Sequence, residues 1–255
     1  MSILDHPQVL QVLFHPRPDY SIQTAGVLPV TVAVESGITV GGCLYPCNAT
    51  APVILYFHGN GEIASDYNDI AQYYHRLGIT LLVMDYRGYG KSGGEPTGTN
   101  LLADALTVFN AIPTIFSEHG ITPSKLFVMG RSLGSVPALE IASRVKDKIN
   151  GLIIESGFAN SFKLLNWLGL SIEGVDETQD GFFNHKKMAQ ITVPTLVIHG
   201  EDDVLIPMTE GQTLYDACPA QKKQWVLIPY AGHNDLMVLG MKQYFEAIST
   251  FVTAH

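Results

Sequence analysis

The sequence predicts a doubly wound, mostly parallel α/β sheet that begins with an antiparallel hairpin. The first observation is a set of short, almost continuously apolar runs at 52–57, 79–85, 125–130, 151–155, 195–200 and 225–229. Continuous apolarity is typical of parallel strands covered on both faces, because neither face meets water. The second observation is that helical patterns alternate with these runs. Such alternation favours a parallel sheet with helices on both sides.

The hairpin comes first along the chain. VTVAVE at 30–35 and ITVGGCLY at 38–45 flank Ser36 and Gly37, and a two-residue turn between strand-like runs indicates a β-hairpin. Helices are expected at about 62–77, 99–117, 132–146, 208–217 and 240–253. Pro137 predicts a kink in one of them, because proline removes a backbone donor.

The alternation pauses once, at about 157–192, before the apolar run at 195–200. No repeat, low-complexity tract or linker divides the chain. We therefore predict a single α/β domain over residues 1–255, with a small cap inserted at 157–192.

Composition limits the partners. The chain is 46% hydrophobic and 15% charged, with a net charge of −9, which suits a folded protein with a sizeable core. Nucleic acid and anionic membrane surfaces both attract clustered Lys and Arg, so the acidic balance argues against either partner.

Cysteine usage favours a reducing compartment. The chain has three cysteines, Cys43, Cys47 and Cys218, and neither a signal-peptide pattern nor a stretch long enough to span a membrane. We expect free thiols in a cytoplasmic protein, with a Cys43–Cys47 disulfide as the alternative. Zinc-ligand spacing is missing.

A candidate nucleophile follows the apolar run at 125–130. VMGRSLGS at 128–135 places Ser132 between Gly130 and Gly134, the pattern of a strand-to-helix turn that exposes a reactive hydroxyl. Residues two positions away must be small in such a turn, and the helix N-terminus favours developing negative charge. The alternative is a glycine-rich turn with a capping serine.

A serine hydroxyl needs a base, and the base needs an orienting acid. HGEDDVLIP at 199–207 supplies Asp202 and Asp203, and YAGHND at 230–235 supplies His233. Both segments follow strands, where functional groups of parallel sheets gather. The order Ser, Asp, His is the one expected of α/β-hydrolases.

Taken together, the segments resemble the α/β-hydrolase family. They are YFHGNGE (56–62), DYRGYGKSGGEP (85–96), GRSLGS (130–135), ESGF (155–158), HGEDDVLIP (199–207) and GHND around His233. From about residue 30 onward the chain resembles short, soluble serine esterases and thioesterases, in a branch that includes serine aminopeptidases and protein depalmitoylases.

The resemblance implies a catalytic triad of Ser132, His233 and Asp203. Asp203 is preferred to Asp202 because the family's acid lies four residues after the histidine of the HG pair. Glu155 then acts as a hydrogen-bonding neighbour. His233 would take the proton of Ser132, which attacks an acyl carbonyl, and water would later release the acyl group.

An oxyanion hole needs two backbone donors. The N–H of Leu133, directly after the nucleophile, supplies one. The resemblance implies the N–H of Asn60 as the other, with Gly61 as the alternative. Glycines at 59 and 61 would let the backbone approach a substrate closely.

Substrate contacts are expected at Gly59, Gly61, Phe158 and Trp167. Trp167 lies in SFKLLNWLGLSI (161–172), which could wall an acyl pocket or simply pack between cap and core. The short cap indicates an open site that admits exposed esters or thioesters, and short- to medium-chain carboxylic esters are favoured, with thioesters close behind. The triad chemistry implies no metal or organic cofactor.

Four other functions are weaker. GYGKSG at 88–93 matches a dinucleotide-binding pattern, but Gly94 and Pro96 keep it out of the required helix. Protein depalmitoylases of the family have a Cys-rich N-terminus, and a peptidase would need an acidic pocket; neither signature is present. A non-catalytic scaffold would be free to lose the motifs that are complete here.

Overall fold

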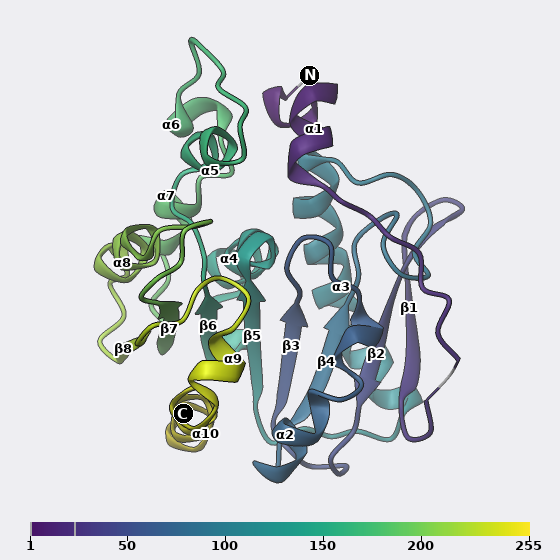
Figure 1. Ribbon diagram of the computed structural model, residues 1–255. Coiled ribbons are helices and arrows are strands. Elements are labelled where there is room, and N and C mark those ends of the chain that lie inside the picture. The colour runs from purple at the N-terminus through teal and green to yellow at the C-terminus, as the bar shows by residue number, and fades with distance from the viewer. Residues whose placement is uncertain (1, 23) are drawn as a thin grey trace.

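Eight strands form one sheet in the order β1-β2-β4-β3-β5-β6-β7-β8, in a computed structural model that describes residues 2–22 and 24–255 (Figure 1). The strands are β1 (Leu28–Glu35), β2 (Ile38–Tyr45), β3 (Val53–Phe57), β4 (Thr80–Met84), β5 (Leu126–Arg131), β6 (Gly151–Glu155), β7 (Thr195–Gly200) and β8 (Lys223–Ile228). β1 and β2 form the antiparallel hairpin, β2 pairs antiparallel with β4, and β3 to β8 are parallel. The predicted fold class is confirmed.

Both faces of the sheet are covered, which explains the continuous apolar runs. In β3, Val53, Leu55 and Phe57 belong to the core on one face of the sheet, while Ile54 and Tyr56 belong to the core on the other face. Every residue of β3, β4 and β6 is buried. In a strand with one face exposed to water, apolar and polar residues would alternate along the sequence instead.

The helices lie close to the predicted positions, with three differences. They are α1 (Pro7–Leu13), α2 (Ala71–Arg76), α3 (Gly98–Glu118), α4 (Ser135–Val145), α8 (Met208–Ala217), α9 (Leu236–Leu239) and α10 (Met241–Ala254). The expected helix at 62–77 is split into a 3₁₀ turn at Ala64–Tyr67 and α2. Neither α1 nor α9 is among the expected helices.

The third difference concerns Pro137. Helix α4 begins at Ser135, after a 3₁₀ turn at Ser132–Gly134, so Pro137 lies in its first turn. The first four N–H groups of a helix have no intrahelical acceptor. The proline therefore removes no helical hydrogen bond, and the basis for the predicted kink was wrong.

The segment between β6 and β7 contains three short helices, α5 (Ser161–Trp167), α6 (Glu177–Asp180) and α7 (Asn184–Met188). Figure 1 shows α5 and α6 projecting beyond the carboxyl ends of the strands, with α1 rising beside them. Helix α7 packs on α4 and α8, and α1 contacts α5. The N-terminal helix and this segment thus lie at the edge of the sheet where Ser132 is found.

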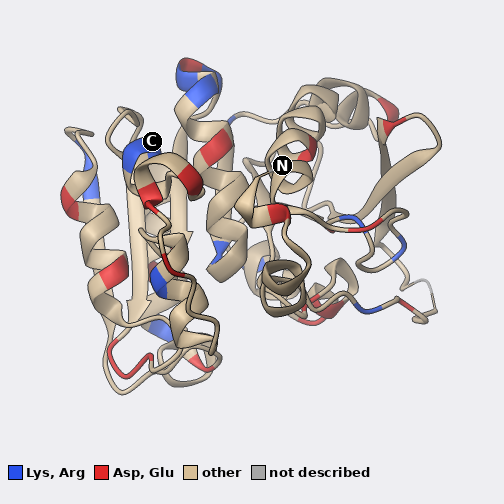
Figure 2. Ribbon diagram, turned by 90° about the horizontal axis from the view of Figure 1, so that it is seen from above, with Lys and Arg blue, Asp and Glu red and all other residues tan. Residues whose placement is uncertain are grey.

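Acidic and basic positions are interspersed over the face seen in Figure 2. All three cysteines are free, as expected, and Cys218 is buried. Among the helices of residues 2–22 and 24–255, none has the length and apolar character needed to cross a membrane.

Candidate active site

Ser132 lies in a strained turn between β5 and α4. Its φ is 52°, in the left-handed region, where a residue other than glycine costs of order 1–3 kcal/mol. A Cβ on Gly130 would run into the carbonyl oxygen of Gly134, and a Cβ on Gly134 into that of Phe57. The two glycines therefore permit the close approach of β5, α4 and β3 that forces this turn.

The hydroxyl of Ser132 points to a histidine rather than to the helix. Ser132 Oγ lies 2.9 Å from Nε2 of His233, and Nδ1 of His233 lies 2.7 Å from Oδ2 of Asp203. The N-terminal residue of α4 has no side-chain cap, so Ser132 is not a capping serine. Ser132, Asp203 and His233 are only 8%, 5% and 8% exposed. The structure thus brings these three residues into one buried hydrogen-bonded chain.

Of the two adjacent aspartates, only Asp203 points inward. Its Oδ1 accepts hydrogen bonds from the N–H groups of Leu205 (3.0 Å) and Ile206 (2.8 Å), and His199 Nε2 lies 3.4 Å from its Oδ2. Burial alone would raise the pKa of Asp203, but the hydrogen bonds from His199, His233 and the backbone outweigh burial and lower it. The carboxylate of Asp203 is therefore ionised at neutral pH. The side chain of Asp202, by contrast, is exposed to solvent and is not part of this hydrogen-bonded chain.

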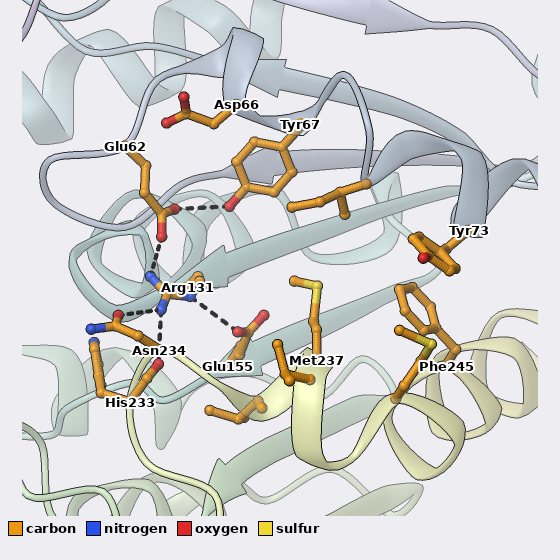
Figure 3. Close-up of a pocket in the computed structure, with 14 residues that line it drawn as sticks. Glu62, Asp66, Tyr67, Tyr73, Arg131, Glu155, His233, Asn234, Met237 and Phe245 are labelled. Carbon is orange, nitrogen blue, oxygen red and sulfur yellow. Dashed lines mark hydrogen bonds and ion pairs between the residues drawn. The ribbon is translucent and has the colours of Figure 1, made fainter.

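Arg131, next to the serine, holds the histidine loop in place (Figure 3). Its Nη2 donates to the carbonyl oxygen of His233 (2.8 Å) and to Oδ1 of Asn234 (2.9 Å). Its Nε donates to Oε1 of Glu155 (3.1 Å), and its Nη1 pairs with Glu62. One buried guanidinium therefore joins the ends of β5 and β6 to the loops that carry Glu62 and His233.

The two carboxylates on Arg131 have different environments. Glu62 also accepts from the N–H of Gly59 (2.8 Å) and the hydroxyl of Tyr67 (2.9 Å). Burial is the largest single influence and opposes its charge, but Arg131, His58 and these two hydrogen bonds together outweigh burial, so the pKa of Glu62 is lowered. For Glu155, burial prevails over Arg131 and over the hydroxyl of Tyr244, so its pKa is raised.

Sequence reasoning expected Glu155 as a hydrogen-bonding neighbour but missed Arg131 and Glu62. The only signal for Arg131 was a charged residue between an apolar run and the candidate nucleophile. Arg131 and Asn234 are 103 positions apart, so no local pattern could have joined them.

The loop after β3 carries Asn60 and is fixed from two sides. Asn60 Oδ1 accepts from the backbone N–H of His15 (2.8 Å) and the hydroxyl of Tyr89 (2.6 Å). Arg17 Nε donates to the carbonyl oxygen of Gly61 (2.8 Å). Within residues 2–22 and 24–255, the backbone N–H groups of Asn60 and Leu133 donate to no protein acceptor. The predicted oxyanion role requires donors that are free in this way.

The segment at 85–94 supports this loop. It forms no helix. Oδ1 of Asp85 accepts from the N–H of Ala64 (2.8 Å), Tyr86 donates to the carbonyl oxygen of His58 (2.5 Å), and Tyr89 holds Asn60. The glycine pattern that resembled a nucleotide site therefore belongs to the scaffold of the Asn60 loop.

The four residues expected to touch substrate have different surroundings. A Cβ on Gly59 would meet Arg131 and Glu62, so this glycine makes room for their ion pair, while Gly61 has open space and a φ of +76°. Phe158 is 0% exposed and packs against Phe182 in the core. Trp167 is 38% exposed at the end of α5.

Comparison with known proteins identifies a family. Residues 48–172 and 178–237 match the family described as "Serine aminopeptidase, S33". Alpha/beta hydrolase domain-containing protein 17C of Xenopus tropicalis is 31% identical over 227 residues, covering 86% of this chain and 67% of that protein. Alpha/beta hydrolase domain-containing protein aho-3 of Caenorhabditis elegans is 32% identical over 206 residues, covering 78% of this chain and 57% of that protein. The chain thus spans roughly 57–67% of the length of these relatives.

Solved structures share the fold at lower identity. An esterase of Pyrococcus furiosus superposes with a TM-score of 0.76 at 17% identity, over 94% of this chain and 98% of that one. Est1E from Butyrivibrio proteoclasticus superposes with a TM-score of 0.69 at 17% identity, over 89% of this chain and 98% of that one. These likenesses concern the arrangement of the sheet and helices.

Proposed function

The chain belongs to the serine aminopeptidase S33 family of α/β-hydrolases, and we propose that it is a serine hydrolase that cleaves carboxylic ester or thioester bonds. The observation that carries the proposal is the buried chain from Ser132 through His233 to Asp203, which begins at a strained turn. Strained backbone of this kind is concentrated at functional sites. Because the solved structures with this fold include esterases, esters are the first substrates to test.

In this mechanism His233 is the general base. Its Nε2 takes the proton of Ser132 as Oγ attacks the acyl carbonyl, and Asp203 holds the Nδ1–H and stabilises the imidazolium. The tetrahedral intermediate collapses when Nε2–H protonates the leaving oxygen or sulfur, which leaves the acyl group on Ser132. Water, activated by His233, then hydrolyses the acyl-enzyme and regenerates the serine.

The carbonyl oxygen becomes negatively charged in the intermediate. We assign its stabilisation to the backbone N–H groups of Leu133 and Asn60, supported by the absence of competing protein acceptors in the described residues. The loss of one such donor typically lowers kcat by about 10²–10³-fold. The contacts from His15, Arg17 and Tyr89 would keep the Asn60 loop from moving when charge develops.

A hydrolysis series tests the proposal. Wild-type protein and Ser132→Ala are compared on p-nitrophenyl esters of increasing acyl length, with a matched thioester at the preferred length. We expect wild-type turnover with a preferred length, and a loss of about 10⁴–10⁶-fold in the variant, because the residual rate comes from binding and the oxyanion donors alone. The thermal unfolding of the two proteins should coincide within a few degrees.

Two results would contradict the proposal. One is an unchanged rate in Ser132→Ala. The other is a folded wild-type protein that hydrolyses none of the substrates, which would favour a non-catalytic member of the family.

A further inference from the structure

His199 is a buried histidine on β7, four residues before Asp203, and the mechanism above gives it no role. Its ring stacks on Trp225 of the neighbouring strand β8, with the ring centroids 6.2 Å apart. On the side of α8, a Cβ on Gly211 would run into Nδ1 of His199, so the glycine leaves room for the ring. Strand β8 and helix α8 thus confine this side chain from two sides.

The two ring nitrogens of His199 have different surroundings. Nε2 lies 2.9 Å from the carbonyl oxygen of Ile206, which can only accept a hydrogen bond, so Nε2 carries the proton. Nδ1 is buried and, among residues 2–22 and 24–255, has no hydrogen-bond partner. An unpaired buried acceptor destabilises a fold. An apolar side chain would therefore suit this position better, unless the Nε2–H of His199 has a role.

The hydrogen bonds of Ile206 indicate that role. While its carbonyl oxygen accepts from His199, its N–H donates to Oδ1 of Asp203 at 2.8 Å. With Oδ1 bound to the backbone, the other carboxylate oxygen, Oδ2, lies 2.7 Å from Nδ1 of His233. Nε2 of His199 also lies 3.4 Å from Oδ2. His199 therefore holds the loop segment that orients the carboxylate of Asp203.

We infer that His199 is a positioning residue, which aims the carboxylate of Asp203 at His233 by holding the carbonyl group of Ile206. The inference rests on the proposed function and adds a fourth side chain to the hydrogen-bonded chain that begins at Ser132. Without the Nε2–H of His199, the loop after β7 loses its hydrogen bond to the strand. Catalysis is sensitive to such a change, since a displacement of about 1 Å can lower a rate by about 10²-fold.

Two substitutions of His199 separate its hydrogen bond from its packing. His199→Gln keeps a donor, because the side-chain nitrogen of glutamine falls close to Nε2 of histidine, whereas His199→Met has a similar volume and no donor. On the best p-nitrophenyl ester we expect His199→Met to lower kcat by about 30-fold and to leave KM within about twofold, because only the aim of Asp203 changes. His199→Gln should stay within about threefold of the wild-type kcat.

The comparison of these variants decides between two roles. Equal losses of kcat in His199→Met and His199→Gln would limit His199 to packing and overturn the inference. A wild-type kcat in His199→Met would overturn it as well.

Gly211→Ala reaches the ring from α8 and leaves every hydrogen-bonding side chain in place. Its methyl group would collide with Nδ1 of His199 and turn the ring away from Ile206. We expect a kcat about tenfold lower in the wild-type background, but less than about twofold lower when His199→Gln is already present, because the flexible glutamine side chain gives way. A full tenfold loss in both backgrounds would contradict a role for the ring position.

Proton NMR of Ser132→Ala separates this inference from the proposed function, because it needs no turnover. The Nδ1–H of a histidine bonded to a carboxylate gives a far-downfield resonance, provided that its exchange with water is slow; loss of the signal on adding Asp203→Asn would assign it. We expect the resonance to persist when His199→Gln is added and to disappear with His199→Met.

The two hypotheses can then fail separately. If wild-type protein hydrolyses no ester but the resonance depends on His199 in this way, the positioning contact stands and the proposed function fails. If esters are hydrolysed and the resonance is unchanged in His199→Met, the inference is wrong and the proposed function stands.

Discussion

Asp203→Asn is expected to lower kcat by about 10⁴-fold, whereas Asp202→Asn should retain a wild-type kcat. The amide side chain introduced by Asp203→Asn would keep an oxygen for the N–H groups of Leu205 and Ile206. Its NH₂ group would then face Nδ1 of His233, now 2.7 Å from a carboxylate oxygen. That arrangement favours the tautomer with the proton on Nε2, which cannot accept the proton of Ser132.

The matched control lies one residue away. Asp202 has the same side chain but is exposed, and its backbone N–H donates to the carbonyl oxygen of Ala231 at 2.9 Å, a contact that neither substitution removes. The measurement is kcat on the best p-nitrophenyl ester for both variants, with circular dichroism to establish that each is folded. Similar losses in the two variants, or a larger loss at Asp202, would refute the assignment of the acid.

Arg131→Met is expected to destabilise the protein by about 3–5 kcal/mol, because it leaves buried carboxylates without their cation. Glu155 is 1% exposed and Glu62 is largely buried, so water cannot replace the guanidinium at both sites. Urea unfolding measures this loss. A free energy of unfolding equal to that of wild type would contradict the described network.

The Arg131→Lys variant tests whether Arg131 positions His233 for catalysis or only stabilises the fold. Lysine keeps the charge but lacks the planar fork that reaches Glu62, Glu155 and the His233 carbonyl together. We expect a folded protein with kcat about tenfold lower and KM little changed, because the loop of His233 loses its anchor while Ser132 and the backbone donors of Asn60 and Leu133 are unaltered. A wild-type kcat in Arg131→Lys would limit Arg131 to a role in stability.

The sequence was sufficient to predict the sheet, because strands buried on both faces leave continuous apolar runs. Strand-end placement was also sufficient to predict that Ser132 and His233 would meet one of the two aspartates at 202 and 203, since those ends share one edge of the sheet, and the family resemblance then selected Asp203. The glycines at 130 and 134 made the strand-to-helix turn predictable, because a Cβ at either position would collide with backbone atoms.

Other features left no readable pattern in the sequence. Helix α1 is a seven-residue segment, too short for its periodicity to stand out. The partners of Arg131 come from loops that only the folded sheet brings together. Phe158 belongs to a motif near the site, yet its side chain points into the core, because motif membership does not determine the direction of a side chain.

The most direct test of the central claim is covalent labelling with a serine-directed fluorophosphonate, mapped by peptide mass spectrometry. A serine activated by His233 should attack the phosphorus, displace fluoride and carry one adduct, while serines without a base remain unmodified. We predict a single adduct on Ser132 in wild type and none in Ser132→Ala. A folded wild-type protein that takes up no label, or an adduct that persists in Ser132→Ala, would contradict the account.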